Sequence, residues 1–422
     1  MQAIVLAAGK GTRMKSQLPK VLHRVLGKPL LEYVLACLAD MGVRGPKVVI
    51  GYGAEEVRSF LRDAGDRLNI KPDVVHQRVQ LGTGHAVMMA EGLLAGSRRD
   101  ILIWPGDMPL VKRSTLEALI REHEISDSDV SVLSSLQVNP TGYGRILRAG
   151  GRFYAIREEL DATEAERRIQ EVNTGVYLFK AAPLFSALKK IKPTNRKNEF
   201  YLTDVIEMLV GENRTVSAFP LASSEEGQGI NDRKDLAGVI KIMGMREIHQ
   251  HMEKGVTFVA PEQTFVAKGV TIGADTVIYP WCYIESGVKI GCRCEIGPFA
   301  KIRAGSTVDD GSAIGSFVEV NRSKIGKKVN AKHLAYLGDA VIGDGTNVGA
   351  GTITANFDGV KKNKTRIGKN VLIGSDTIFV APVTVADSAR TGAGAVVTRG
   401  SKIKTGEVFV GVPARPLKTK RK

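Results

Sequence analysis

The second half of the chain repeats with a period of six residues. An aliphatic side chain occupies every sixth position from Val266 to Val320, and glycine often follows it. The phase slips near Ile325, resumes at Ile342 and, after a second gap, runs on to Ile403. A sustained period of six predicts a parallel β-helix, whose triangular coils stack and share one continuous aliphatic core. Chance does not sustain such a pattern over this length, so the repeat decides the architecture of this half.

The first half alternates instead between strand-like and helix-like segments. Pro29 opens a helix that Gly42 closes, and Ser114 with Glu117 forms a capping box for another helix. This alternation predicts an α/β, Rossmann-like domain in which helices cover both faces of a parallel sheet. The expected strands, which are short apolar runs, are residues 2–8, 47–52, 73–77, 100–104, 130–136 and 175–180.

A chain of 422 residues is long enough for two or three domains. Residues 232–254 carry apolar side chains at three- and four-residue steps, which predicts a long connecting helix. We therefore expect an α/β domain over residues 1–228, a linker helix over 229–254, a β-helix over 255–413 and a basic tail over 414–422.

The first expected strand ends in a run of small residues, 7–11 (AAGKG). Small side chains let backbone N–H groups approach a phosphate closely, and Arg13 and Lys20 add two cations beside them. Met14 stands where a dinucleotide fingerprint needs glycine, and the Gly-Lys-Ser/Thr of a Walker loop is absent. A plain glycine-rich turn is the alternative, but it does not explain the accompanying cations.

Three further turns follow expected strands of the first half. Asp107 comes after strand 100–104, and a carboxylate at that edge, facing phosphates, commonly holds Mg²⁺; a simple turn aspartate is the alternative. Residues 80–85 (QLGTGH) form a turn that is able to pack on a flat base, while Thr83 caps a helix. Residues 141–145 (TGYGR) form a second glycine-rich turn. Because ligands lie at the carboxyl ends of parallel strands, these turns are expected to share one site.

Residues 332–339 (KHLAYLGD) interrupt the repeat of the second half, and we expect them to leave the solenoid as a ligand-binding loop. His333 lies in this stretch, and an unperturbed imidazole titrates near neutral pH, which suits a general base acting on an amine. An exposed loop histidine is the default interpretation without these neighbours. The fold alone does not indicate acyl transfer, because many β-helices serve only for oligomerisation.

The composition narrows the class of ligand. A net charge of +16 calls for an anionic partner. Aromatic residues make up only 6% and no nucleic-acid motif is present, so we expect small phosphorylated ligands and no nucleic acid. Cys292 and Cys294 lack a second pair of ligands for zinc, and the few, scattered cysteines suit a reducing compartment. No apolar run reaches membrane-spanning length, which favours a cytoplasmic protein without membrane insertion.

Residues 6–14 (LAAGKGTRM) and 18–20 (LPK) closely resemble the signature of sugar-1-phosphate nucleotidyltransferases. Nearly the whole chain is similar to the bifunctional N-acetylglucosamine-1-phosphate uridyltransferase/glucosamine-1-phosphate acetyltransferase family. The resemblance implies a left-handed β-helix, a homotrimer, Mg²⁺, and UTP and acetyl-CoA as co-substrates. It also implies acetylation of glucosamine 1-phosphate in the β-helix, then uridylyl transfer to N-acetylglucosamine 1-phosphate in the α/β domain. The product would be UDP-N-acetylglucosamine for bacterial envelope polymers.

The resemblance assigns roles to individual residues of the first domain. Arg13 and Lys20 match catalytic cations, and Asp107 and Asn231 match metal ligands. Residues 199–204 (EFYLTD) match a further hallmark, which we interpret as structure around the sugar pocket. The matched contacts to UTP or the UDP-sugar are Leu6, Ala7, Ala8, Gly9, Arg13, Lys20, Gln77, Gly82, Thr83, Gly144, Glu158, Asn173 and Asn231.

Roles carry over to the β-helix in the same way. His333 matches the base that deprotonates the acceptor amine. The matched contacts to the amino-sugar phosphate are Arg303, Asn321, Tyr336 and Asn347. The matched contacts to acetyl-CoA are Ala350, Asn356, Phe357, Ser375 and Ala393, of which Asn356 and Ser375 are candidates to steady the thioester oxyanion.

The chain departs from the family pattern at three positions. Asn321 replaces the usual Lys, with Arg322 or Lys324 as candidate substitutes, and Phe357 replaces the usual Tyr. Gly411 replaces a frequent Arg, for which Arg415 is the candidate substitute. Two alternatives therefore stay open: a uridylyltransferase whose β-helix only trimerises it or acetylates another amino sugar, and a non-catalytic regulatory scaffold. The scaffold hypothesis predicts that the catalytic cations or the metal-site aspartate have been lost. Arg13, Lys20 and Asp107 are all present, which disfavours it.

Overall fold

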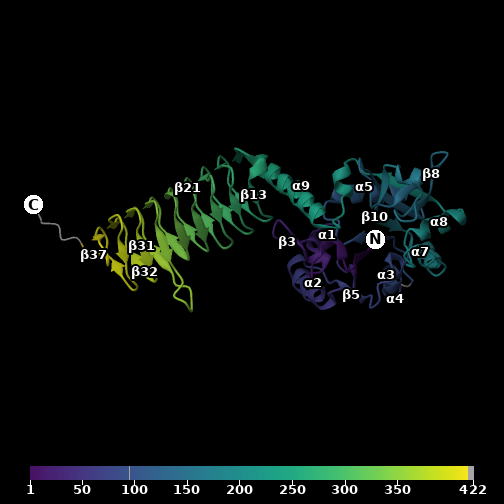
Figure 1. The fold of residues 1–422 in the computed structure, drawn as a ribbon, viewed down its shortest axis with the longest axis horizontal. Coiled ribbons are helices and arrows are strands. Elements are labelled where there is room, and N and C mark those ends of the chain that lie inside the picture. The colour runs from purple at the N-terminus through teal and green to yellow at the C-terminus, as the bar shows by residue number, and fades with distance from the viewer. Residues whose placement is uncertain (95, 417–422) are drawn as a thin grey trace, which may run out of the picture. The chain divides into compact units, whose positions relative to one another are not determined.

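The computed structural model describes residues 1–94 and 96–416, which divide into two compact units between Ile240 and Lys241. Each unit has cores of its own. Figure 1 shows an α/β unit and a long stack of β-coils. Helix α9 (Arg233–Met252) is the expected connecting helix and runs across the boundary between the units. Within the described residues, no helix is both long and apolar enough to cross a membrane.

The first unit is built on a mixed sheet with the order β11-β7-β10-β6-β1-β4-β5. The strands on this path are β1 (Gln2–Ala7), β4 (Lys47–Ile50), β5 (Asp73–His76), β6 (Ile101–Pro105), β7 (Val130–Leu136), β10 (Glu171–Phe179) and β11 (Val216–Pro220). The expected strands are present, but the prediction of a wholly parallel sheet was wrong, because β10 runs antiparallel to β6 and β7. Along the chain, the antiparallel hairpin of β8 (Arg145–Ala149) and β9 (Arg152–Arg157) and the one-turn helix α6 (Glu164–Arg167) connect β7 to β10, and β8 also pairs antiparallel with β10.

Strand β1 lies in the middle of this sheet, and both of its faces are buried. Ile4 is fully buried in the core on one face, whereas Ala3 and Val5 are fully buried in the core on the other. A strand covered on both faces reads as an unbroken apolar run, which is why the sequence marked it clearly. The small-residue loop therefore begins at a fixed point, at the carboxyl end of a central strand.

Helices cover both faces of the sheet, as predicted. They are α1 (Leu30–Asp40), α2 (Ala54–Leu68), α3 (Thr83–Met89), α4 (Glu91–Leu94), α5 (Arg113–Ile125), α6 (Glu164–Arg167), α7 (Ala181–Leu188) and α8 (Asp204–Gly211). Short elements complete the unit: η1 (Thr12–Met14), η2 (Lys20–Leu22), η3 (Ser224–Gly227), β2 (Arg24–Val25) and β3 (Lys28–Pro29). Helices α1, α2 and α5 pack in one core, and α3, α4, α7 and α8 in the other.

The expected capping box of α5 was wrong. The helix begins at Arg113, and Glu117 pairs with Arg113 at 2.7 Å rather than reaching back to a cap. Glu226, far away in sequence, supplies the acceptor instead: its Oε2 accepts the backbone N–H of Lys112 at 3.1 Å and the hydroxyl of Thr115 at 2.6 Å. A local pattern cannot reveal a partner that only the tertiary fold brings to the helix end.

The second unit is the predicted left-handed parallel β-helix, with three ladders of short strands. The first ladder holds β12 (Thr257–Phe258), β15 (Val277–Ile278), β18 (Glu295–Ile296), β21 (Ala313–Ser316), β24 (Asn330–His333), β27 (Asn347–Val348), β30 (Leu372–Ile373), β33 (Arg390–Thr391), β36 (Val408–Val410) and β37 (Arg415–Pro416). The second holds β13 (Phe265–Val266), β16 (Tyr283–Ile284), β19 (Lys301–Ile302), β22 (Glu319–Asn321), β25 (Tyr336–Gly338), β28 (Ile353–Ala355), β31 (Ile378–Val380) and β34 (Val396–Val397). The third holds β14 (Thr271–Ile272), β17 (Lys289–Ile290), β20 (Thr307–Val308), β23 (Lys324–Ile325), β26 (Ala340–Ile342), β29 (Thr365–Ile367), β32 (Val383–Val385) and β35 (Lys402–Ile403), and a short η4 (Pro261–Gln263) lies in the first coil.

The aliphatic repeat forms the core of this unit. Ile284, Ile302 and Val320 pair in register from coil to coil, and all three are fully buried. Stacked coils leave each aliphatic side chain in contact with the same position above and below, which explains the strict period. Gly411, where the family often has Arg, has a φ of +88° that glycine accommodates without strain. Of the expected basic tail, residues 417–422 lie outside the described residues.

The interruption of the repeat differs from the prediction. Ile296 pairs with Ile314, but Ile314 pairs with Ala331, so this coil is one residue shorter than the coil before it. Residues 332–339 stay within the solenoid in β24 and β25, and the expected loop there was wrong, because one missing residue is enough to shift the phase. The segment that leaves the solenoid is residues 356–364, between β28 and β29 (Figure 1).

Candidate active sites

The loop after β1 presents its backbone to an open space. Gly11 has a φ of +59°, and a Cβ on it would lie 2.9 Å from Cβ of Lys20, so the close approach of these two segments needs glycine. A Cβ on Gly9 would meet no described atom within 4 Å. The loop therefore has room for a ligand at Gly9, and η1 and η2 follow it with Arg13 and Lys20.

Each of the two expected cations contacts one of the two expected metal ligands. Nζ of Lys20 pairs with the carboxylate of Asp107, and NH2 of Arg13 donates to Oδ1 of Asn231 at 2.9 Å. Asp107 and Asn231 come together because the backbone N–H of Ile230 donates to the carbonyl of Asp107 at 3.2 Å. Opposite charges and oxygen ligands are thus concentrated at one point, as phosphate binding with a divalent ion requires.

The donor set fits Mg²⁺ better than a softer metal. Among the described residues, no group of three or more His, Cys, Asp and Glu side chains could hold a metal ion. Mg²⁺ keeps several of its waters and takes only one or two protein oxygens beside substrate phosphates, so one carboxylate and one amide oxygen suffice. Asp107 and Asn231 are the residues that would hold it.

A cavity of about 490 Å³ opens beside this loop. Its lining residues are Gly11, Thr12, Arg13, Lys20, Gly142, Glu158, Glu159, Leu160, Lys197 and Tyr201. Burial raises the pKa of Glu158, whose Oε1 accepts the Thr203 hydroxyl at 3.2 Å. Gly144 lies against Glu158 and accepts the backbone N–H of Asn173 at 2.8 Å, so three expected sugar contacts converge. Tyr201 belongs to the segment 199–204 that was expected around the sugar pocket, whereas Lys197 was not expected in this cavity.

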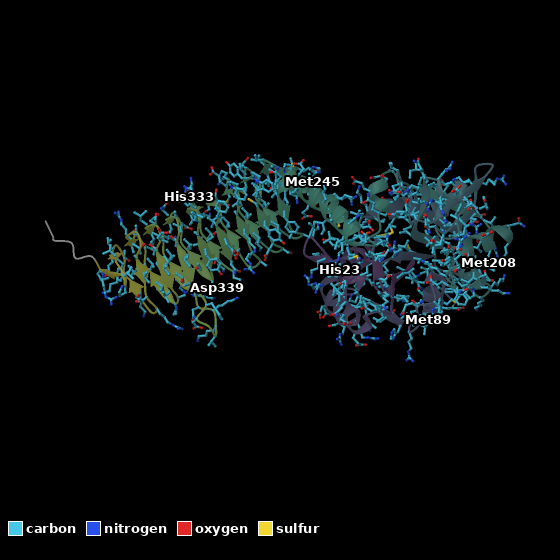
Figure 2. The ribbon with its side chains drawn as sticks, in the orientation of Figure 1. His23, Met89, Met208, Met245, His333 and Asp339 are labelled. Atoms are coloured by element: carbon cyan, nitrogen blue, oxygen red, sulfur yellow. The ribbon has the colours of Figure 1, made fainter. Side chains whose placement is uncertain are left out.

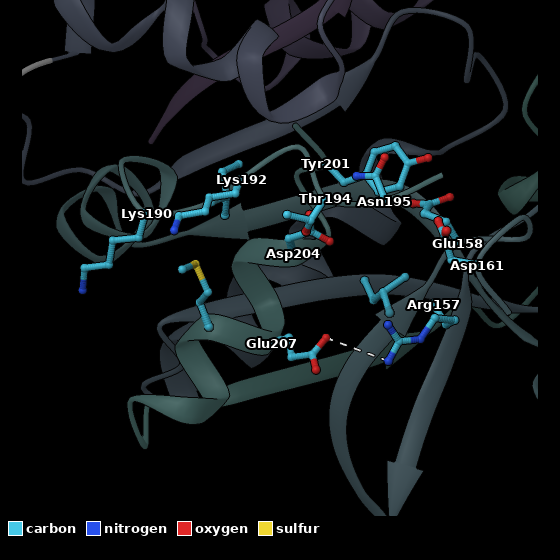
Figure 3. A pocket seen from close by; sticks show the side chains of 13 residues that line it. Arg157, Glu158, Asp161, Lys190, Lys192, Thr194, Asn195, Tyr201, Asp204 and Glu207 are labelled. Carbon is cyan, nitrogen blue, oxygen red and sulfur yellow. Dashed lines mark ion pairs between the residues drawn. The ribbon is translucent and has the colours of Figure 1, made fainter. Parts of the chain in front are cut away.

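A second cavity, of about 750 Å³, shares Glu158 and Tyr201 with the first. Figure 3 shows acidic and basic side chains around it, with the Arg157–Glu207 ion pair at one end. Burial and the nearby charge of Glu158 raise the pKa of Asp204 to about 6. The residues 199–204 thus contribute directly to both cavities, which fits the interpretation of that segment as structure around the sugar pocket.

Gln77, Gly82 and Thr83 form a compact turn. Nε2 of the buried Gln77 contacts the carbonyl of Gly82 at 3.1 Å and Nδ1 of His85 at 2.9 Å. Thr83 does not cap α3, contrary to the prediction, because its hydroxyl accepts the backbone N–H of Leu202 at 3.0 Å. The turn is therefore held by residues 199–204, and Gln77 lies in it with its amide already bonded.

His333 ends strand β24, where Ser316 pairs with it in register. It lines a cavity of about 240 Å³. The other lining residues are Tyr279, Glu295, Gly297, Pro298, Ala313, Gly315, Ser316 and Lys332. The exposed imidazole is therefore presented on the side of the solenoid, beside a shallow pocket, although not on the loop that we expected.

A polar network at the next corner of the solenoid connects expected contacts to the amino-sugar phosphate with an expected contact to acetyl-CoA. Arg322 donates to Asp339 through Nε at 2.8 Å and NH2 at 2.7 Å, and through NH1 to Oδ1 of the buried Asn321 at 2.9 Å. Nδ2 of Asn356 donates to the same carboxylate, and Nδ2 of Asn321 donates to the Tyr336 hydroxyl at 3.3 Å. Asp339 was not among the expected site residues, because one aspartate in a turn carries no signal before its partners are known.

Arg303 does not present a free charge. Its NH1 pairs with Glu319 at 3.1 Å and its Nε with Glu285 at 3.6 Å. The amide of Asn321 is neutral, so Arg322 is the cation that lies against the position where the family has Lys. Asn347 lies exposed on β27, in register with Asn330 of β24.

Three of the expected acetyl-CoA contacts, Ala350, Ser375 and Ala393, form a column along successive coils, whereas Asn356 and Phe357 lie at the next corner, after β28. The carbonyl of Ala350 accepts the N–H of Asp376, and the carbonyl of Ser375 accepts the N–H of Gly394, next to Ala393. Phe357 is 59% exposed on the 356–364 loop, bridged to Lys362. Figure 2 shows Asp339, which holds Asn356, and His333 on different sides of the solenoid.

Two family models match parts of the chain. Residues 3–178 match the MobA-like NTP transferase domain, and residues 287–322 match six repeats of the bacterial transferase hexapeptide. The loop after β1 lies within the first match and the start of the polar network within the second. The fold and the two sites together define a bifunctional transferase, with a nucleotidyltransferase unit followed by a hexapeptide acyltransferase unit.

Full-length relatives agree with this class. The chain is 41% identical to "Bifunctional protein GlmU" of Pelotomaculum thermopropionicum over 91% of this chain and 90% of that protein. It is 41% identical to proteins of the same name from Geobacillus thermodenitrificans, over 94% and 92%, and Heliobacterium modesticaldum, over 97% of each. The chain belongs to the family of bifunctional protein GlmU, which confirms the family inferred from the sequence.

Proposed function

We infer that this chain is a bifunctional enzyme that makes UDP-N-acetylglucosamine. The β-helix unit transfers the acetyl group of acetyl-CoA to glucosamine 1-phosphate, and the α/β unit transfers a uridylyl group from UTP to the product. One observation supports uridylyl transfer by the α/β unit: the loop after β1 brings together Arg13, Lys20, Asp107 and Asn231.

The uridylyl step needs positioning and charge neutralisation more than covalent help. A phosphate oxygen of the acceptor sugar attacks the α-phosphorus of UTP in line, and pyrophosphate leaves. Arg13 and Lys20 bind the triphosphate as the negative charge moves to the leaving group. Mg²⁺, held by Asp107 and Asn231, would supply further neutralisation of the phosphates. Gly144, Glu158 and Asn173 hold the amino sugar.

The acetyl step uses a base. His333 takes a proton from the amine of glucosamine 1-phosphate as the amine attacks the thioester carbonyl, the C–S bond breaks, and the proton passes to the departing thiolate of coenzyme A to give the thiol. Arg322 supports phosphate recognition from its place against Asn321, while the small residues Ala350, Ser375 and Ala393 leave space along the solenoid for coenzyme A. UTP and acetyl-CoA are cytoplasmic metabolites, which supports a cytoplasmic location.

We also propose a homotrimer. Exposed rings of Trp281, Phe299 and Phe317 stack along successive coils, with centroids 6.1 Å and 5.0 Å apart, and exposed Leu334 continues the row. An apolar row of this kind is typical of a surface covered by a partner. His333 precedes Leu334 at one corner of the solenoid and Asn356 follows β28 at the next, and in the proposed trimer these two residues would meet from different copies.

Two variants of one chain test both activities. Asp107→Ala should lose pyrophosphate release from UTP and keep thiol release from acetyl-CoA, and His333→Ala should do the reverse. Each variant is thereby the folding control for the other. Thiol release absent from the wild-type chain would leave the β-helix as a trimerisation unit, and normal pyrophosphate release by Asp107→Ala would remove that residue from the metal site.

A further inference from the structure

The first turn of α9 is fixed by a reciprocal cap. Oδ1 of Asp232 accepts the backbone N–H groups of Lys234 and Asp235 at 2.8 and 3.0 Å. Oδ2 of Asp235 accepts those of Asn231 and Asp232 at 2.8 and 3.3 Å. Capping of this kind removes the freedom of a helix end. The backbone that carries Asn231 and Arg233 therefore has one defined position in the first unit.

Arg233 extends from this turn to both segments that follow β1. Its Nε donates to the carbonyl of Met14 at 3.2 Å, and its NH1 lies 3.4 Å from Nδ1 of His23. Met14 ends η1, which carries Arg13, and His23 directly follows η2, which begins at Lys20. One guanidinium group thus spans the two segments whose cations were assigned to the triphosphate.

The state of His23 suits this arrangement. The side chain is 6% exposed, and burial, followed by the charge of Arg233, lowers its pKa. A neutral ring with its proton on Nε2 leaves Nδ1 free to accept from Arg233. A hydrogen bond with the backbone of Leu18 acts against this lowering of the pKa, and Nδ1 is the ring nitrogen that contacts Arg233.

We propose that Arg233 is a positioning residue for uridylyl transfer. It touches no reacting atom in the proposed reaction; it sets the separation of η1 from η2, and hence of Arg13 from Lys20. A planar guanidinium carries its donors on separate atoms at fixed angles, so it spans two segments that the single Nζ of a lysine would have to approach together. A second crossing bond, from Arg13 to Asn231, opens when Arg13 turns to a phosphate, and the Arg233 contacts then keep the loop in place. The inference rests on the proposed function of this loop.

The experiment compares Arg233→Ala and Arg233→Lys with Lys234→Ala, which removes a neighbouring exposed charge from the same helical turn. We expect Arg233→Ala to lose about tenfold or more in kcat/KM for UTP, because small displacements of binding groups cost rate steeply. Thiol release from acetyl-CoA by the same preparation should stay unchanged, and Arg233→Lys should recover only part of the loss. Millimolar guanidinium should restore activity to Arg233→Ala and leave Lys234→Ala unaffected.

Uridylyl transfer by Arg233→Ala within twofold of wild type would overturn the proposal. So would a loss that guanidinium does not relieve and that appears equally in thiol release, since that pattern reports general unfolding. A wild-type chain without pyrophosphate release would instead refute the proposed function of the loop. The wild-type control therefore separates the two failures.

Discussion

Replacing Asp339 by Asn tests the polar network of the β-helix most directly. In the structure this carboxylate accepts two bonds from Arg322 and one from Asn356, and its side chain is 13% exposed. The bonds from Arg322, with a smaller contribution from Asn356, hold the pKa of Asp339 below its usual range. The substitution keeps the shape, removes the charge and places an amide N–H₂ against a donor.

The size of the effect follows from these contacts. A hydrogen bond to a charged group contributes about 1.5–3 kcal/mol net, and the low end applies because Arg322 is about one-third exposed. An Asn at this position retains roughly one of the three bonds, so about 3 kcal/mol is lost from the network. Without these bonds Asn356 is no longer held beside the thioester. If half to all of the lost free energy is added to the barrier of acetyl transfer, the rate falls about 10- to 100-fold.

Thiol release from acetyl-CoA measures this step, and pyrophosphate release from UTP in the same preparation is the internal control. Asp344→Asn is a matched variant, because Asp344 also pairs with a cation, Lys369 at 3.4 Å, on an exposed turn of the same solenoid. Only Asp339→Asn should lose thiol release. A rate within twofold of wild type for Asp339→Asn, or an equal fall for Asp344→Asn, would refute the role of the network.

Three further predictions concern the metal, pH and assembly. Chelation with EDTA should abolish pyrophosphate release, spare thiol release and be reversed by added Mg²⁺; retention of both activities would contradict the Mg²⁺ site. Asp204 has a pKa of about 6 in the folded chain against an ordinary 3.8, so the free energy of unfolding should fall as pH rises between these values. Asp204→Asn should therefore raise that free energy by roughly 1–2 kcal/mol at pH 7.5 and leave it unchanged near pH 4, as followed by thermal unfolding; an equal gain at both pH values would exclude this cause. Phe317→Asp should dissociate the proposed trimer in light scattering, and an unchanged mass would place the interface elsewhere.

Much of the fold was predictable because it depends on periodicity. The six-residue repeat predicted the β-helix, since every coil buries the same position, and the buried run of β1 predicted the loop at its end. The direction of β10 was missed, because antiparallel pairing follows from the β8–β9 hairpin and not from any residue of β10 itself. The position of residues 332–339 was missed because a one-residue deletion and a loop give the same break in phase.

The sequence by itself determined the architecture of both units and the residue types at the two sites, because repeats, burial patterns and glycine-rich turns are local properties. Tertiary structure alone decided which groups meet. It placed Arg233 on Met14 and His23, Glu226 at the start of α5, and Asp339 between Arg322 and Asn356. Hydrogen bonds and ion pairs depend on distance and direction in space, and residues separated by tens or hundreds of positions acquire both only when the chain folds.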